Sequence, residues 1–275
     1  MRGIAAGLAL GLSITLGAGA PAQSDRQTDQ AGYETGPFTP EVFDIWIDAR
    51  AGTGEPVYWY STGTVRAFPS GELLFEMEGY DASTAFRPEG EDVPVAHQYN
   101  RKIYVYRDPE TGEIIEEMNG MAVQPVAYPY QFITYTLEDG EMKTVVEQGA
   151  GERLQTFTDD KMSWRRLGDT YVFTAPVFLD IPIGPDRRLE AWENYDFFIH
   201  PDGAVEEPHQ LSWARVGQLP PWAGGQMAVL HLITWRVEDY EAIPARFRDY
   251  IETEAPLWRE PPADLDEIRA LQQGE

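Results

Sequence analysis

The feature that most constrains this chain is a long succession of strand-length segments separated by short turns. From residue 56 to residue 237, runs rich in Val, Ile, Tyr, Phe and Thr recur. Turn sequences separate them, such as DPETG at 108–112, EDG at 138–140 and PDG at 201–203. Roughly nine or ten strands follow one another without a helix-length amphipathic segment among them. This pattern predicts an antiparallel sheet rather than parallel strands joined by helices.

An antiparallel meander of this kind exposes two sheet edges unless it closes on itself. We therefore predict a mainly β fold, an antiparallel up-and-down β-barrel of lipocalin-like form, as a single domain over residues 41–275. A β-sandwich and an incompletely closed barrel fit the same pattern. Helices are expected only from about residue 242, where IPARFRDYIETEAP and PADLDEIRALQQG each carry a narrow apolar stripe. Such stripes suit packing on the outside of the barrel or across one mouth.

Residues 1–22 have the composition of a secretory signal peptide. Arg2 precedes an apolar run from Ile4 to about Leu16, and a series of small residues ends at Ala22. Residues 23–40 lack periodicity and are expected to form a flexible lead-in. We expect a periplasmic or secreted protein, and the alternative is a retained N-terminal anchor. No other stretch approaches the roughly 20 apolar residues that a membrane-spanning helix needs.

The charge balance is strongly acidic. The chain has 46 acidic and 21 basic residues, a formal net charge of −25. Because nucleic acids are bound mainly through Lys and Arg on their phosphates, a nucleic-acid partner is not expected. Anionic membrane surfaces are disfavoured for the same reason. The acidity is typical of a protein kept soluble by its charge, or adapted to a salty medium.

Four stretches of the sequence resemble a known family when they are taken in order. These are YWYSTGTV at 58–65, VYRDPETGEI at 105–114, LSWARVGQLPPW at 211–222 and YIETEAPLW at 250–258. Their order and spacing resemble a bacterial family catalogued as the domain of unknown function numbered eighteen thirty-eight. The resemblance covers about residues 41–262. It implies one full-length domain and no particular activity.

Motifs of several enzyme classes are missing from the sequence. There is no Gly-x-Ser-x-Gly elbow, no phosphate-binding Gly-rich loop, no dinucleotide fingerprint, no paired-His zinc helix and no calcium loop. There is also no cysteine, which excludes thiol catalysis and cysteine-bound metals. His200 and His209 flank one predicted turn and could form a metal site with Glu193 or Asp196, but their spacing matches no established ligand pattern. We predict neither a metal nor a cofactor.

The segment AHQYNRKIYVYR, residues 96–107, places a cation among aromatic residues on either face. Alternation groups Tyr99 and Arg101 on one face and Lys102 with Tyr104 on the other. Because a buried cation must be paired, an inward Arg101 would bind a ligand or a carboxylate, and Tyr99 would lie beside it. The alternative is a stripe on the protein surface.

Two further residues could move protons inside a barrel. Glu193 shares a face with Ala191, Tyr195 and Phe197, which is typical of an inward carboxylate in apolar surroundings. It could equally serve as the partner of a cation such as Arg101. His231 lies within MAVLHLITW and is expected to be buried, either as a hydrogen-bonded core residue or as a general acid or base in a pocket.

Aromatic residues supply the candidate ligand contacts. In YWYSTGTVR, Trp59 shares a face with the smaller Ser61 and Gly63, which leaves room above it for a ligand or for a neighbour's side chain. Trp213 and Trp222 lie near the Pro220-Pro221 corner and are candidates for the rim of a mouth. Tyr99 and Tyr195 complete the set.

These observations lead to one hypothesis and two rivals. The first is a periplasmic carrier that binds a small hydrophobic or aromatic molecule in the barrel. The second is a cofactor-free lyase, isomerase or decarboxylase, in which Glu193, Tyr99 or His231 moves a proton and Arg101 steadies an anion. The third is an envelope interaction module with a filled barrel.

Overall fold

The structure is a computed structural model that describes residues 32–149, 155–159, 161–184, 187–201 and 208–274. The predicted signal peptide at 1–22 lies outside these residues. Within the described ranges, no helix combines the length and the apolar character needed to cross a membrane.

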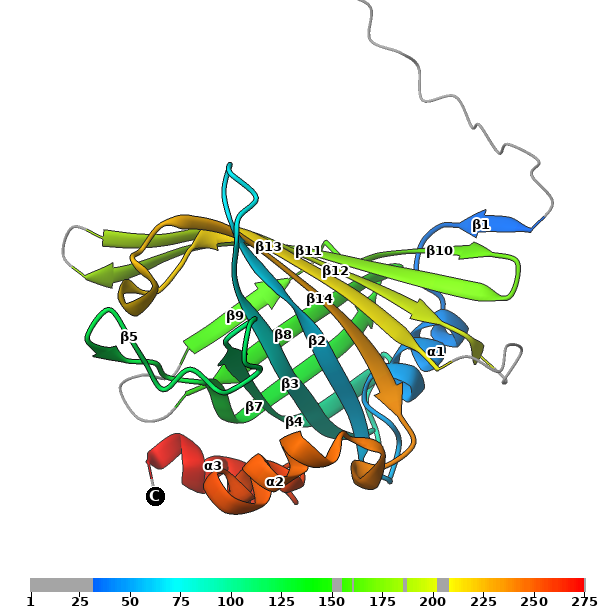
Figure 1. The fold of residues 1–275 in the computed structure, drawn as a ribbon. Helices are drawn as coiled ribbons and strands as arrows, with labels where there is room; N and C mark the ends of the chain where they lie inside the picture. Colours follow the sequence, from blue (N-terminus) through cyan, green and yellow to red (C-terminus); the bar gives the residue numbers. More distant parts are fainter. Residues whose placement is uncertain (1–31, 150–154, 160, 185–186, 202–207, 275) are drawn as a thin grey trace, which may run out of the picture. The chain divides into compact units, whose positions relative to one another are not determined.

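One antiparallel sheet of twelve strands dominates this part of the chain (Figure 1). Its strands are β1 (Tyr33–Thr35), β2 (Val57–Ala67), β3 (Leu73–Phe86), β4 (Val95–Arg107), β7 (Val126–Glu138), β8 (Glu141–Gln148), β9 (Gln155–Asp159), β10 (Ser163–Leu167), β11 (Thr170–Gly184), β12 (Arg187–Ile199), β13 (Gln210–Gln218) and β14 (Met227–Val237). The small hairpin of β5 (Glu117–Met118) and β6 (Met121–Ala122) forms a second sheet. The mainly β, antiparallel, up-and-down prediction is confirmed.

The large sheet curls into a half-barrel. The strand order is β1-β10-β11-β12-β13-β14-β2-β3-β4-β7-β8-β9, so β14 pairs with β2 and brings distant parts of the chain together. Strands β9 and β10 stand near opposite ends of this order and do not pair in the described residues. Because only residues 160–162 connect them, Asp159 and Ser163 can be at most about 14 Å apart. The chain therefore brings β9, at one edge of the sheet, near β10, which is next to the other edge. Because β9 and β10 do not pair in the described residues, the barrel is incompletely closed.

A helix that the sequence analysis missed lies before the large strands. Helix α1 (Pro40–Arg50) begins after Thr39, whose hydroxyl accepts a hydrogen bond from the Val42 N–H. Phe43, Trp46 and Ile47 are buried at helical spacing. Helices were expected only at the end of the chain, so that prediction is wrong here. Residues 33–35 also depart from a flexible lead-in, since they form β1 and pair with β10.

The inner, concave face of the sheet carries two apolar clusters. The first lies under α1 and joins Trp46 to rings from several strands, such as Trp59, Tyr135, Phe173 and Phe197. The second gathers around Trp222, in the short 3-10 helix η3 (Pro221–Ala223), with Phe75, Met77, Tyr106 and Leu230 among its members. Polar side chains of the inner face come between the residues of these two clusters along the strands.

Part of the outer face, over β2–β4 and β7, is covered by the C-terminal segment (Figure 1). This segment comprises η4 (Tyr240–Ala242), α2 (Ala245–Glu254), η5 (Pro256–Arg259) and α3 (Leu265–Gln273). Phe247 and Ile251 of α2 pack with Tyr60, Tyr80 and Ile103 of the sheet, so both faces of β2–β4 are buried. Of the two placements expected for these helices, packing on the outside of the barrel is the one observed.

Candidate functional site

A buried ion pair lies on the inner face of β12 and β13. Glu193 and Arg215 are direct partners in the strand register, and Arg215 Nη1 lies 3.1 Å from Glu193 Oε1. The other carboxylate oxygen, Oε2, accepts hydrogen bonds from the Tyr195 hydroxyl at 2.7 Å and from Trp213 Nε1 at 3.3 Å. Three donors therefore converge on one carboxylate that is 7% exposed.

The residues around Glu193 are less deeply buried than its carboxylate. Tyr195, Trp213 and Arg215 are each partly exposed, whereas Glu193 behind them is buried. Burial, and next the charge of Glu193, raises the pKa of the Tyr195 phenol well above its usual value. Tyr195 therefore stays protonated at neutral pH and can donate its hydrogen bond to Glu193. We call Glu193, Tyr195, Trp213 and Arg215 the inner cluster.

A second polar network faces the inner cluster from β3 and β4. Arg50, at the end of α1, places Nη2 3.1 Å from Asp81 Oδ2, and the Tyr104 hydroxyl donates to Asp81 Oδ1 at 2.8 Å. Arg50 also lies over the Phe197 ring, with its guanidinium carbon 5.7 Å from the ring centroid, and Phe197 stacks on Tyr195, so the two networks are neighbours across the inner face. Both networks lie in the part of the strands between the two apolar clusters.

Five of the predicted site residues lie on the inner face, namely Glu193, Tyr195, Trp213, Trp59 and Trp222. Glu193, Tyr195 and Trp213 come together in one cluster. Trp59 also faces inward, where it packs at right angles to Phe197 and donates Nε1 to the Arg50 carbonyl at 3.0 Å. Trp59 is 1% exposed, so it is a core residue under α1 rather than a free ligand contact.

The predicted role of Arg101 and Tyr99 inside the barrel is wrong, because both face outward. Arg101 Nε donates to the Pro129 carbonyl at 2.7 Å and Nη1 to the Glu260 carbonyl at 3.0 Å, while Nη2 pairs with Glu267 of α3. Tyr99 packs with Ile268 of α3. These two residues attach the C-terminal helices to the sheet.

The other two predicted residues also occupy different places. His231 is exposed on the outer face, where Nε2 lies 3.2 Å from the Ser212 hydroxyl, so its expected burial is wrong. Its neighbours Leu230 and Leu232 turn inward instead. Trp222 is 7% exposed and packs against Phe75 and Tyr106, so it fills one end of the inner face instead of standing at an open rim.

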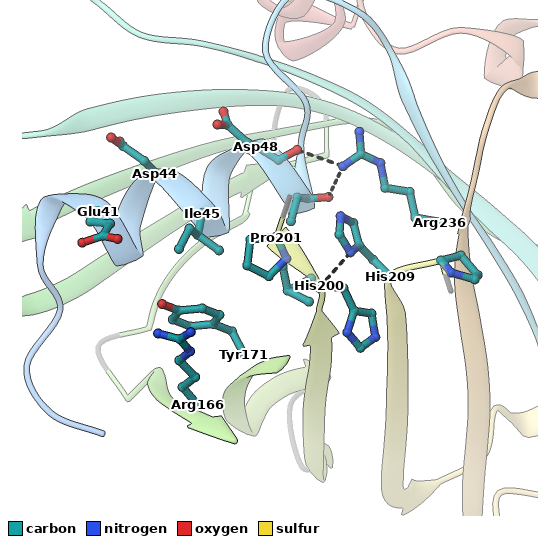
Figure 2. A pocket seen from close by; sticks show the side chains of 13 residues that line it. Glu41, Asp44, Ile45, Asp48, Arg166, Tyr171, His200, Pro201, His209 and Arg236 are labelled. Carbon is teal, nitrogen blue, oxygen red and sulfur yellow. Dashed lines mark hydrogen bonds between the residues drawn. The ribbon is translucent and has the colours of Figure 1, made fainter. Parts of the chain in front are cut away.

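A separate cleft of about 1000 Å³ lies beside α1 (Figure 2). His200 and His209 approach each other there, and the His200 backbone N–H donates to His209 Nδ1 at 3.2 Å. Arg236 Nη1 donates to the carbonyls of Asp48 and Ala49 at 2.9 and 3.0 Å. Burial, then Arg236 and His200, lowers the pKa of His209 to about 4, so this imidazole is neutral at pH 7.

The histidine pair does not gain the carboxylates that a metal site would need. Glu193 belongs to the inner cluster, and Asp196 accepts from the Thr174 hydroxyl at 2.6 Å and from Asn194 Nδ2 at 2.6 Å. Across the described part of the chain, no three residues of the types His, Asp and Glu are grouped as metal ligands.

Three functional residues escaped the sequence analysis, namely Arg50, Asp81 and Arg215. Arg215 lies in the register opposite Glu193, 22 positions along the chain, so the pair becomes visible only when β12 and β13 are aligned. The alternation of side chains in LSWARVGQ, residues 211–218, does place Trp213 and Arg215 on one face of the strand. The sequence therefore could have indicated that Arg215 lies beside Trp213. Arg50 could not be found without α1.

Comparison with protein-family models, with curated proteins and with solved structures found no match. The resemblance to the bacterial family of unknown function therefore stays a prediction.

Proposed function

We propose that this chain is an exported binding protein that holds a small hydrophobic or aromatic molecule on the inner face of its half-barrel. The observation that carries the proposal is the inner cluster, in which a buried Glu193–Arg215 pair positions the partly exposed rings of Tyr195 and Trp213. Aromatic rings with one fixed polar end are suited to stacking on a flat apolar ligand. The sequence of residues 1–22 supports export.

The geometry favours binding over acid/base catalysis. Both oxygens of Glu193 already accept hydrogen bonds from Tyr195, Trp213 and Arg215. The carboxylate therefore orients these side chains rather than acting as a general base towards a substrate. Arg101 and two of the three proton carriers that the catalytic hypothesis offered, Tyr99 and His231, lie on the outer face. Glu193 is therefore a positioning residue in this proposal.

Native mass spectrometry tests the proposal. The protein is purified from an export-competent bacterial host, and we expect the wild-type chain to carry a small molecule that denaturation releases. Trp213→Ala removes a stacking ring and should lose most of that molecule. Trp192→Ala is the matched control, because Trp192 is exposed on the neighbouring strand and opposes Val216 rather than the inner cluster. Equal retention by both variants would contradict the proposed site.

A further inference from the structure

An unusual set of buried polar atoms lies on the inner face beside the inner cluster. Ser83 Oγ, Gln98 Nε2 and Asn100 Oδ1 belong to side chains that are 0% exposed, and none of the three atoms has a hydrogen-bond partner among the described residues. Trp46 Nε1 and Arg50 Nη1 are also buried atoms without a hydrogen-bond partner among the described residues. A buried polar atom without a partner costs free energy, so such a group in a native protein calls for a physical explanation.

The strand register places these atoms together. Ser83 of β3 is the direct partner of Asn100 of β4, and Gln98 lies two residues before Asn100 on the same face. The Tyr135 hydroxyl donates to Gln98 Oε1 at 2.7 Å, and the Tyr135 ring packs edge-on against Trp46. We call Ser83, Gln98 and Asn100 the polar triplet.

Hydrogen bonds to neighbouring strands fix the orientation of the Asn100 amide. Asn100 Nδ2 donates to Gln131 Oε1 at 2.8 Å, and Gln131 Nε2 donates to Gln148 Oε1 at 2.6 Å, which forms a one-way chain across β4, β7 and β8. Turning Asn100 over would break this chain, so its Oδ1 faces away from it as a free acceptor. Gln98 Oε1 accepts from Tyr135, which leaves Nε2 without a partner. Because a phenol can also accept, the Gln98 amide can present either its N–H or its oxygen to a ligand.

The polar triplet is close to the inner cluster. Asp81 lies two residues before Ser83 on β3 and pairs with Arg50, which lies over the Phe197 ring that stacks on Tyr195. Arg50 connects the two regions, since Nη2 pairs with Asp81 while Nη1 is unpartnered. Arg50 and Asp81 thus join the inner cluster to the triplet on the same face of the sheet.

We propose that the ligand of the inner face carries a neutral polar group, a primary amide or a hydroxyl pair, that is recognised by Ser83, Gln98 and Asn100. The triplet offers one acceptor on Asn100 and two groups, the Gln98 amide and the Ser83 hydroxyl, that can each donate or accept, and a neutral group with both functions satisfies all three. A carboxylate accepts only, so it would leave Asn100 Oδ1 unpaired. This inference rests on the proposed function, because it specifies the ligand of the same inner face.

Three probes with the same phenyl ring and nearly the same length test the inference by calorimetry on the full chain. Phenylpropionamide carries a neutral amide, phenylpropionate a carboxylate, and propylbenzene neither. We expect the amide to bind at least about tenfold more tightly than the other two. Trp213→Ala should weaken the binding of all three probes, because it removes the ring contact.

Ser83→Ala is the sharpest variant for this test. The Ser83 hydroxyl makes no hydrogen bond with the described residues, so its removal breaks none in the protein. We expect an unchanged or higher melting temperature, a loss of roughly fivefold in amide affinity, and unchanged propylbenzene affinity. Tyr99→Phe, on the outer face of the same sheet, should change none of the three affinities.

The outcomes separate the two proposals. If all three probes bind equally, and Trp213→Ala weakens the binding of each, the proposed binding site at the inner cluster is supported. The inference that the ligand carries a neutral polar group is then overturned. If none of the probes binds, both proposals fail. If the amide binds more tightly but Ser83→Ala and Gln98→Leu leave its affinity unchanged, the polar group is recognised elsewhere and the assignment to the triplet is overturned.

Discussion

Arg215 and Glu193 face each other on adjacent antiparallel strands, with Arg215 Nη1 3.1 Å from Glu193 Oε1. This pair is set within the inner face of the half-barrel, where a carboxylate without a partner would be costly. Because Glu193 also accepts from Tyr195 and Trp213, the ion pair fixes two aromatic rings at the same time.

Replacing Glu193 with Gln is expected to destabilise the protein. The variant leaves the partly buried Arg215 without its carboxylate and weakens the bonds from Tyr195 and Trp213, so the free energy of unfolding should fall by about 2 kcal/mol. Urea unfolding followed by circular dichroism measures this change. Glu190→Gln is the control, because Glu190 is exposed on the same strand. Equal stability of both variants would mean that the ion pair contributes nothing.

Gly63, in the aromatic segment of β2, is expected to tolerate no side chain. A Cβ at this position would lie 2.0 Å from the His231 carbonyl oxygen and 2.6 Å from Leu232 Cα, which are both backbone atoms of β14. Gly63→Ala should therefore separate β2 from β14 and lower the unfolding free energy by about 3 kcal/mol or more. Gly36→Ala has open space around it and should change the melting temperature little.

Arg101→Met is expected to loosen the C-terminal helices without affecting the inner face. The variant removes the bonds to Pro129, Glu260 and Glu267 and should cost about 3 kcal/mol. Limited proteolysis should then cut within residues 255–274 faster than in the wild-type chain. Arg269→Met is the control, since its ion pair with Asp266 is exposed. Faster loss of ligand with intact helices would contradict the outward placement of Arg101.

The lowered pKa of His209 predicts a dependence of stability on pH. Its pKa falls from 6.5 to about 4 on folding, so the unfolded chain takes up the proton first as the pH is lowered. The associated stability is complete above pH 6.5 and is lost as the pH falls towards 4. After discounting for solvent screening, the loss is on the order of 1 to 2 kcal/mol.

Urea unfolding at pH 7 and at pH 4.5 gives two free energies of unfolding, and the difference between them measures this effect. The fall in stability between the two values should be smaller in His209→Gln than in the wild-type chain, because the neutral amide does not titrate. His231→Gln is the matched control, and it should behave like the wild type, since His231 is exposed. An identical fall in all three proteins would show that His209 is not the titrating group.

Strands β12 and β4 show why the predicted inner face was right for one strand and wrong for the other. In β12, polar residues such as Glu190, Asn194 and Asp196 alternate with Glu193, Tyr195 and Phe197, so the inner face could be recognised. In β4, α3 and η5 cover the outer face, and both sets of side chains are buried. Alternation carries little information where both faces are buried.

The missed helix had its own local signals. Thr39-Pro40-Glu41 is a typical helix start, and Phe43, Trp46 and Ile47 follow at spacings of three and four residues. The contacts of Arg50 with Asp81, and of Arg215 with Glu193, depend in contrast on which strands are neighbours. No single segment of the sequence contains that information.

The central claim is that a small molecule binds at the inner cluster. A crystal structure of the protein with phenylpropionamide tests it most directly. The account predicts that the phenyl ring packs on Trp213 and Tyr195 and that the amide meets Ser83, Gln98 and Asn100. A probe found only in the cleft beside α1, or an inner cluster filled by its own side chains with no probe in contact, would contradict it.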